Sequence, residues 1–538
     1  MADNLNSTNS YAIDFGTSNT VITRWNGVTK TAETITFPNF SQKIPNSPPV
    51  IPSLVYVKDA RLQKVLIGQQ VRDRGLDLAT DNRFFRSFKR GIGADIQGFL
   101  PRLDETEITF EQIGEWFLRE LIQNSQTDAG GNLDSLVVTV PVDSFDTYRL
   151  WLTDICQSLE IGQLRILDEP TAAALGYGAA DQELLLVVDF GGGTLDISLI
   201  QLSENTSSNQ GFILKWGQKI LGENTAQKKQ TAKVIAKAGQ NLGGSDIDNW
   251  LVDYFATNQG LDKSAVTTRL AERLKIKLSE QESATEVYFN DETLESYALE
   301  LDRQGFEAIL EQQGFFTKLD ELMAQVLQRA RRNGIEVEEI NQVLLVGGTV
   351  QIPAVQTWVA KYFEPSKIRC DRPLTAIAEG ALQVAQGIEV KDFLYHSYGI
   401  RYWNRRDKRH NWHSIIKSGQ PYPMAQPVRL VLGASVENQP SIELILGELA
   451  TESVGREVYF DGDRLVTRSL GEQTTNVKPL NDQEGASTIA ILDPPGNPGR
   501  DRIELLFSVD EQSCLRVTVQ DLLTQETLLD NQIVGQLK

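Results

Sequence analysis

The sequence predicts an α/β domain followed by an all-β domain, on three observations. Up to about residue 390, short apolar strands alternate with helical segments, which is typical of α/β folds. After about residue 400, the chain holds short runs of alternating apolar residues bounded by Gly, Pro, Asn and Asp, without helical periodicity. Two glycine-rich turns of similar composition lie in the first part, and they indicate two related halves.

Periodicity places the individual elements. In the first part, strands are expected at 11–13, 136–140, 164–167, 184–188 and 343–346. Helices are expected at 148–159 and 171–177, and the polar stretch 203–230 reads as a surface loop. In the second part, alternation at 442–446, 503–509 and 515–519 predicts the strands of a sandwich.

These elements predict four regions. Residues 1–10 are expected to form a flexible leader, 11–389 the α/β domain, 390–396 a linker and 397–538 the β-sandwich. The basic and aromatic stretch 401–413 falls on a predicted hairpin and is expected to be a solvated loop. The three histidines, His396, His410 and His413, lack partners for a metal site.

Composition excludes several classes of protein. The 538 residues carry a net charge of −20, which disfavours nonspecific binding to nucleic acid or to anionic membranes. Cys156, Cys370 and Cys514 form no CxxC pair, so neither a disulfide framework nor a zinc site is indicated. Without an apolar run of membrane-spanning length or an apolar signal core, a cytoplasmic protein is expected.

The two glycine-rich turns carry the chemistry. Asp14 to Asn19 (DFGTSN) and Asp189 to Thr194 (DFGGGT) each follow an apolar strand. Glycines let backbone N–H groups approach phosphate oxygens, and the hydroxyls add donors. An aspartate can orient a hydrated Mg²⁺, which keeps several waters. No P-loop motif occurs, so two facing turns are expected to share one phosphate group.

Further segments extend this pattern. They are 88–93 (FKRGIG), 137–141 (VVTVP), 166–178 (ILDEPTAAALGYG), 189–196 (DFGGGTLD), 242–248 (LGGSDID) and 345–349 (LVGGT). In order and spacing the chain resembles the DnaK-type seventy-kilodalton heat-shock chaperones. The resemblance implies a duplicated actin-like, ribonuclease H-like ATPase domain and a β-sandwich of the peptide-binding type. It implies Mg-ATP hydrolysis coupled to binding of extended apolar peptides of unfolded proteins, a J-domain co-chaperone, a nucleotide-exchange factor and a stress response.

The resemblance also assigns residues. The implied catalytic residues are Lys89, Glu169, Asp189 and Thr194. The implied ATP or ADP contacts are Asp14, Gly16, Thr17, Ser18, Asn19, Gly191, Gly192, Gly193, Thr194, Gly243, Gly244, Ser245, Glu272, Lys275, Ser279, Gly347, Gly348 and Thr349. Mg²⁺ would be held by Asp14, Glu169, Asp189 and Asp196, mainly through water. Pro141 and Arg165 match positions linked to interdomain signalling and J-domain docking.

The sequence departs from this family in three ways. Ile276 and Gln351 stand where two arginines usually sandwich the adenine, and Leu374 replaces an aspartate. Weaker or less adenine-selective binding is therefore expected. No helical lid is expected after the sandwich, and Lys391 and Asp392 make the linker more polar than usual.

Three other functions stay open. A nucleotide-dependent scaffold or exchange factor would use the same fold and hydrolyse little ATP. A small-molecule kinase would need an acceptor and does not account for the all-β domain. A filament-forming actin relative finds no support after residue 390.

Overall fold

A computed structural model describes the chain except for residues 1–8, 43–46, 79–80, 95, 99, 142–147, 149–150, 153–154, 157–158, 160, 180–182, 205–213, 216–229, 291–294, 386–392, 395–396, 405–408, 417–419, 422, 425, 450–454, 462–463, 471–476, 480–486, 511–513 and 538. Contacts divide it into two units. Unit 1 holds Met1–Thr206, Ile213–Glu389 and Arg456–Ser469; unit 2 holds Ser207–Phe212, Val390–Gly455 and Leu470–Lys538. Within the described part, no helix combines the length and apolarity needed to cross a bilayer.

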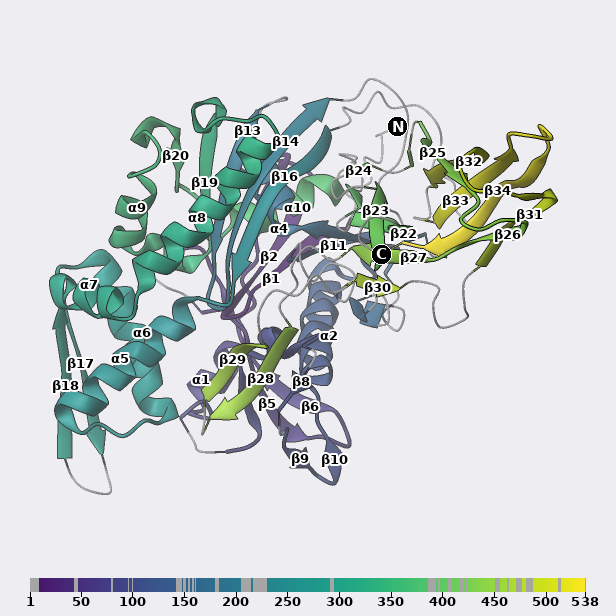
Figure 1. The fold of residues 1–538 in the computed structure, drawn as a ribbon. Helices are drawn as coiled ribbons and strands as arrows, with labels where there is room; N and C mark the ends of the chain where they lie inside the picture. Colours follow the sequence, from purple (N-terminus) through teal and green to yellow (C-terminus); the bar gives the residue numbers. More distant parts are fainter. Residues whose placement is uncertain are drawn as a thin grey trace. The chain divides into compact units, whose positions relative to one another are not determined.

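Two mixed sheets form the framework of unit 1 (Figure 1). The first runs β15-β12-β11-β1-β2-β3 and the second β16-β14-β13-β19-β20. Their strands are β1 (Ser10–Phe15), β2 (Asn19–Asn26), β3 (Thr31–Thr34), β11 (Ser135–Val140), β12 (Gln163–Asp168), β15 (Leu214–Lys215), β13 (Leu184–Phe190), β14 (Leu195–Glu204), β16 (Gln230–Gln240), β19 (Gln342–Val346) and β20 (Ile368–Arg369).

The two sheets repeat one plan. In each, a central antiparallel hairpin (β1–β2, β13–β14) gains a further antiparallel strand on one side. On the other side two parallel strands follow, β11 and β12 in the first sheet and β19 and β20 in the second. The two halves indicated by the paired glycine-rich turns are therefore present as two sheets of the same strand order. Both turns join the two strands of a central hairpin.

The predicted strands of the α/β part are confirmed by β1, β11, β12, β13 and β19. β11 is buried along its whole length, as expected for a parallel strand covered on both faces. In the predicted helix 148–159, the described residues Tyr148, Trp151, Leu152, Ile155 and Cys156 are helical, whereas Leu159 lies in a turn. Most of the predicted loop 203–230 lies outside the described residues.

Helices α4 (Glu169–Gly176) and α10 (Ala376–Ala385) pack against each other with their backbones in contact. Asp168 caps the N-terminus of α4, and its carboxylate accepts a hydrogen bond from the Thr171 N–H at 2.9 Å. A Cβ built on Gly380 would lie 1.8 Å from the carbonyl oxygen of Ala172. One on Gly176 would lie 1.8 Å from that of Ala376. Glycine at both positions lets the two helices approach this closely.

Gly380→Ala is therefore expected to destabilise unit 1 by about 3 kcal/mol, since the new methyl group meets backbone that cannot rotate away. Urea unfolding of the full chain would measure the loss. Gly131→Ala is the matched control, because a Cβ there would meet nothing within 4 Å. Equal stability of the two variants would contradict the observed helix contact.

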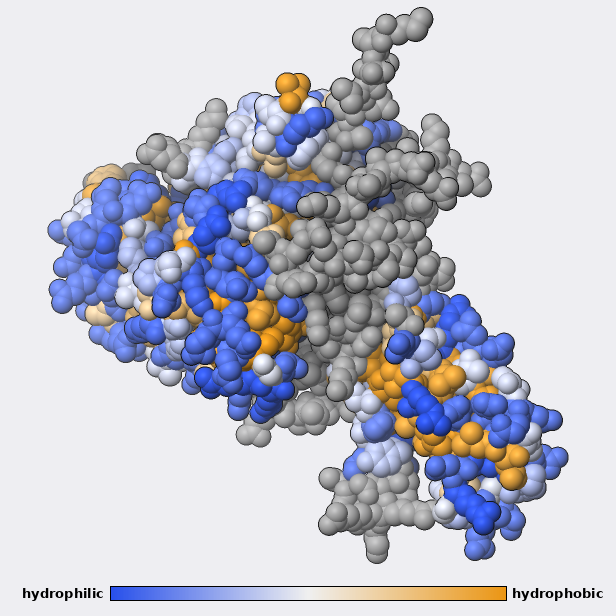
Figure 2. Space-filling view, turned by 90° about the horizontal axis from the view of Figure 1, so that it is seen from above, coloured by the Kyte–Doolittle hydropathy of each residue, from blue (hydrophilic) through white to orange (hydrophobic). Residues whose placement is uncertain are grey.

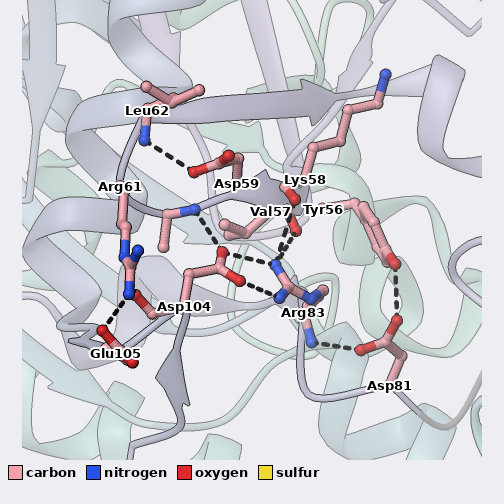
Figure 3. A network of polar contacts seen from close by, with 11 residues as sticks. Tyr56, Val57, Lys58, Asp59, Arg61, Leu62, Asp81, Arg83, Asp104 and Glu105 are labelled. Atoms are coloured by element: carbon pink, nitrogen blue, oxygen red, sulfur yellow. Dashed lines mark hydrogen bonds and ion pairs between the residues drawn. The ribbon is translucent and has the colours of Figure 1, made fainter.

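Three strands and a short helix form a separate lobe of unit 1: β5 (Leu54–Asp59), β6 (Lys64–Ile67), β7 (Phe84–Arg86) and α1 (Gln69–Asp73). Figure 3 shows the polar network beside it, in which the Arg83 guanidinium donates to the two carboxylate oxygens of Asp104 at 2.5 and 3.0 Å. The Ala60 N–H also donates to Asp104, at 2.8 Å. The hydrogen bond from Arg83 lowers the pKa of Asp104 to about 2. This network fixes the chain directly before β7.

The second half of unit 1 carries most of its helices (Figure 1). They are α5 (Gly244–Gln259), α6 (Ala265–Glu280), α7 (Arg303–Gln312), α8 (Phe315–Arg332) and α9 (Pro353–Val359), with the hairpin β17 (Ser283–Asn290) and β18 (Glu295–Asp302). In the first half, the long helix α2 (Phe110–Ala129) begins with a capping box formed by Thr109 and Gln112. The hairpin β28 (Gly455–Asp461) and β29 (Arg464–Leu470) joins unit 1 through parallel pairing with β8 (Ile96–Gln97).

Unit 2 is built from strands, as the sequence predicts. One sheet runs β23-β22-β27-β30, another β25-β32-β33-β34, and β26 pairs with β31. The bounds are β22 (Ser397–Asn404), β23 (Arg409–Ile416), β25 (Val428–Gly433), β26 (Gln439–Leu444), β27 (Leu446–Leu449), β30 (Val477–Pro479), β31 (Ser487–Gly496), β32 (Asp501–Val509), β33 (Cys514–Asp521) and β34 (Thr527–Gln536). Residues from all three sheets share one buried cluster, so the sheets pack face to face. Lys391 and Asp392 of the predicted linker lie outside the described residues.

Candidate active site

The first glycine-rich turn joins β1 to β2 and is tied to its surroundings on both sides. Asp14 accepts a hydrogen bond from the Thr139 hydroxyl at 2.9 Å. The Ser53 hydroxyl donates to the Gly16 carbonyl at 2.7 Å, and the Ser53 N–H donates to the Ser18 carbonyl at 2.8 Å. A Cβ on Gly16 would lie 2.1 Å from the backbone oxygen of Asn19, so this turn requires glycine.

The second turn, between β13 and β14, anchors two further predicted segments. The Gly191 carbonyl accepts hydrogen bonds from the Gly244 N–H at 3.1 Å and the Thr349 hydroxyl at 2.8 Å. The Gly192 carbonyl accepts from the Ser245 N–H at 2.9 Å. Three segments that are far apart in the sequence, and that were each predicted to contact the nucleotide, therefore meet at one turn.

The two turns face each other at close range. A Cβ on Gly192 would lie 1.9 Å from the Ser18 hydroxyl oxygen, and one on Gly193 would lie 2.6 Å from that of Thr17. Gly347, which precedes Gly348 and Thr349, has φ +88°, and a Cβ there would lie 2.4 Å from the carbonyl oxygen of Phe190. The hydroxyls and N–H groups of both halves can therefore converge on one anion.

Lys89 and Glu169 form the ion pair at the centre of the predicted site. Lys89 lies in a short 3-10 helix, Phe88–Gly91, and Glu169 is the first residue of α4. The Lys89 ammonium donates to the Glu169 carboxylate at 3.0 Å, and both side chains are less than 10 % exposed. Burial alone would lower the pKa of Lys89, but the charge of Glu169 raises it above its usual value. Lys89 is therefore a fixed cation.

Further carboxylates lie near this ion pair: Asp14 and Asp189 both feel the charges of Lys89 and Glu169, and Asp196 acts on Asp189. Burial, and then repulsion by Glu169, raises the pKa of Asp14 to about 7. Burial and the charges of Glu169, Asp196 and Asp14 raise the pKa of Asp189 well above its usual value. A divalent cation would relieve this excess of negative charge. In the described part of the chain no three acidic, histidine or cysteine side chains lie close enough to bind a bare ion. The residues fit a hydrated Mg²⁺.

The predicted face of α6 lies beside the second turn. The Lys275 ammonium donates to the Gly244 carbonyl at 2.8 Å and pairs with Asp248 at 2.7 Å. Glu272 pairs with Arg72 at 3.0 Å. The Ser279 hydroxyl donates to the Lys275 carbonyl within the helix. Lys275 is thus joined to the phosphate-facing loops, whereas Glu272 is joined to the lobe that carries α1.

Sequence reasoning assigned no role to Arg90 and Asp246. The Arg90 guanidinium, only 3 % exposed, donates to the Gly193 carbonyl at 2.5 Å and pairs with Asp246 at 2.6 Å. Arg90 follows Lys89 directly and Asp246 follows Ser245, so both lie within the segments 88–93 and 242–248 of the predicted site. Their pairing links the two halves, which local pattern cannot show.

The two residues linked to docking are also described. Arg165, on β12, donates to the carbonyl oxygen of Val384 at the end of α10. Pro141 follows β11 directly and is partly exposed. The docking role of both stays a prediction.

Comparison with known proteins agrees with this geometry. A family model described as Hsp70 protein matches residues 63–208 and 228–402, which is more than half of the chain. The chain belongs to the Hsp70 family. This membership confirms the resemblance seen in the sequence, and members of the Hsp70 family are ATPases with an actin-like domain.

Individual curated relatives share between 25% and 29% of their aligned residues with this chain. The chain is 29% identical over 388 residues to the chaperone protein DnaK of Thermotoga petrophila, 28% over 439 residues to chaperone protein dnaK1 of Synechocystis, and 25% over 535 residues to the DnaK of Thermosipho melanesiensis. These matches cover 69%, 77% and 95% of this chain. In the same order, they cover 58%, 54% and 78% of the relatives' own lengths. The chain thus spans little more than half of the length of the first two.

The structure describes all three residues at which the sequence departs from the pattern expected for the base site. Ile276 is 41% exposed on α6. The Gln351 amide donates only to the Gly348 carbonyl, at 3.5 Å, among the described contacts. Leu374 packs against the apolar cluster Val21, Val50 and Ala378. No guanidinium group from these positions can stack on a base.

Introducing the two arginines, Ile276→Arg with Gln351→Arg, is expected to tighten ATP binding. Stacking of a guanidinium on a ring is worth about 1 kcal/mol, or roughly fivefold in affinity for each arginine. Calorimetric titration with ATP would measure the change. Val287→Arg adds a charge at a 60% exposed position on β17 and is the control. An unchanged dissociation constant for ATP in the double variant would indicate that the base does not lie between positions 276 and 351.

Proposed function

We propose that this chain is an ATP-dependent chaperone-like protein that hydrolyses Mg-ATP at the two facing turns. The observation that carries the proposal is the buried Lys89–Glu169 pair amid Asp14, Asp189 and Asp196. A buried cation next to several mutually repelling carboxylates suits a reaction in which charge on the transferring phosphate must be neutralised.

Each group has a role in that reaction. Water attacks the γ-phosphorus, the bond to the bridging oxygen breaks, and ADP and phosphate leave. Lys89 stabilises charge on the γ-phosphate, and Glu169, which it orients, accepts a hydrogen bond from the attacking water. Thr17 and Thr194 donate to the phosphates. The four carboxylates would hold a hydrated Mg²⁺, which neutralises phosphate charge when bound.

Unit 2 would bind an extended apolar peptide. In the described part, β25 ends its sheet, so its outer edge can accept a further strand. Apolar atoms also lie at the surface of unit 2 (Figure 2). Val436, Ile491, Leu523 and Ile533 are 49% to 74% exposed there. We extend the proposal to unfolded segments as ligands, and to a J-domain co-chaperone and an exchange factor as partners in the cytoplasm.

Hydrolysis rates with and without peptide would test this function. We expect slow ATP hydrolysis by the full chain, accelerated severalfold by a short apolar peptide and unchanged by an acidic peptide of the same length. The acceleration would establish coupling between the ATPase site and a peptide site. A rate indifferent to both peptides would leave an ATPase without chaperone coupling.

The altered base site favours one alternative, a nucleotide-dependent scaffold that hydrolyses little ATP. Ile276 and Gln351 remove the stacking that would hold adenine tightly. Glu169→Ala distinguishes the two functions. A scaffold keeps its cellular activity in this variant, whereas the proposed ATPase loses it.

A further inference from the structure

A polar pocket lies beside the first glycine-rich turn and reaches the lobe formed by β5, β6, β7 and α1. Its charged and hydroxyl lining is Thr17, Ser18, Ser53, Arg72, Asp77, Arg86, Ser87, Ser245, Asp248, Arg269 and Glu272. The hydroxyls of Thr17, Ser18 and Ser245 are among the predicted nucleotide contacts. The pocket therefore opens from the proposed phosphate site.

Most charged groups of this pocket are paired. Arg72 binds Glu272 at 3.0 Å, and Arg269 binds Asp77 at 3.1 Å. Asp248 binds Lys275, which lies beside the pocket, at 2.7 Å. These three pairs use the carboxylates of the described pocket lining. Within the described part of the chain, Arg86 has neither an ion pair within 4.0 Å nor a hydrogen bond from its guanidinium, although its charge acts on the Asp248 and Glu272 carboxylates of the same pocket.

The backbone holds Arg86 next to the first turn. Arg86 ends β7 and pairs with Leu54 of β5. Leu54 follows Ser53, which hydrogen-bonds to the carbonyls of both Gly16 and Ser18. On its other side, Ser87 adopts a left-handed conformation with φ 53° and separates Arg86 from the short 3-10 helix that carries Lys89. The network of Arg83 and Asp104 fixes the start of β7 (Figure 3).

We propose that Arg86 binds the phosphates of the nucleotide in the proposed ATPase site, as a cation in addition to Lys89. The inference rests on the proposed function. A guanidinium presents two parallel donors that match phosphate oxygens, and an arginine already placed in a cleft loses little freedom on binding. Because Arg86 comes from a different lobe than the two turns, phosphate binding would also draw that lobe onto the nucleotide.

Affinities for AMP, ADP and ATP test this assignment. We expect Arg86→Gln to lower the affinity for ATP and ADP by about 10- to 100-fold and that for AMP severalfold less, because the added phosphates carry the contact. Arg86→Lys keeps the charge, and its affinity for ATP and ADP should fall by only about threefold. Arg74→Gln removes an exposed arginine of the same lobe and should bind all three nucleotides as the unaltered chain does.

The outcomes separate this inference from the function that it rests on. If the unaltered chain binds none of the three nucleotides, both the ATPase proposal and the role of Arg86 are refuted. Tight binding that is unaffected by Arg86→Gln would refute Arg86 alone. An equal loss of affinity for AMP, ADP and ATP would indicate that Arg86 contacts the sugar or the base. That result would overturn phosphate binding by Arg86. If Arg86→Gln fails to fold, Arg86→Lys decides by the same comparison.

Discussion

Lys89→Ala is expected to slow ATP hydrolysis by about 100- to 1000-fold, the usual cost of removing one preorganised group that stabilises transition-state charge. The variant leaves Glu169, Asp14 and Asp189 around the phosphates without the ammonium that partly balances them. ATP affinity should change far less, because the two turns still supply their N–H and hydroxyl donors. Single-turnover rates at saturating Mg-ATP separate these two effects.

Lys58→Ala is the control for this experiment. Lys58 is exposed on β5, in the lobe that precedes Lys89, and lines no described part of the site. The Lys58→Ala variant should hydrolyse ATP at the rate of the unaltered chain. If Lys89→Ala were as fast as Lys58→Ala, the buried ion pair would be structural and the catalytic assignment would fall.

Asp14→Asn is expected to stabilise the nucleotide-free chain while abolishing tight Mg-ATP binding. The folded pKa of Asp14 is about 7, above its ordinary value of 3.8, so the folded state holds an extra proton between these values. Stability therefore falls as pH rises from about 4 to 7 and stays low above 7. Asparagine keeps an acceptor for the Thr139 hydroxyl without the charge. The variant should be about 2 to 4 kcal/mol more stable at pH 8.

Urea unfolding at pH 5, 6.5 and 8 measures this effect, and the advantage of Asp14→Asn should shrink as pH falls. Asp104→Asn serves as a control of opposite sign. The pKa of Asp104 is lowered to about 2, so its charge stabilises the fold throughout this range. The Asp104→Asn variant should be less stable than the unaltered chain at all three pH values. A stability gain for Asp14→Asn that did not depend on pH would contradict the buried-charge explanation.

The strand pattern and the position of the two tight turns could be predicted from local sequence. The short apolar run 184–188, bounded by a glycine-rich turn, is typical of a buried strand, and the glycines of DFGGGT permit a tight turn. The repeated turns indicated two related halves, and the shared strand order of the two sheets agrees with that prediction. Alternation in the last part likewise predicted β32 and β33.

Contacts between distant segments could not be predicted. Arg90 meets Asp246 across 156 residues and Arg72 meets Glu272 across 200, and neither pair leaves a periodic trace in the sequence. The grouping of Arg456–Ser469 with unit 1 depends on the pairing of β28 with β8, for the same reason. Arg86 was overlooked because an arginine at the end of a strand is usually a solvated surface residue, and only the pocket reveals its position.

The most direct test of the central claim is a single turnover of Mg-ATP by the full chain. One equivalent of ATP would be mixed with excess protein and Mg²⁺, and ADP and phosphate would be followed over time. The proposed site predicts complete conversion to one ADP and one phosphate per ATP, lost on chelation of Mg²⁺ and in Lys89→Ala. ATP recovered intact from the protein after many hours would contradict hydrolysis and leave a nucleotide-binding scaffold.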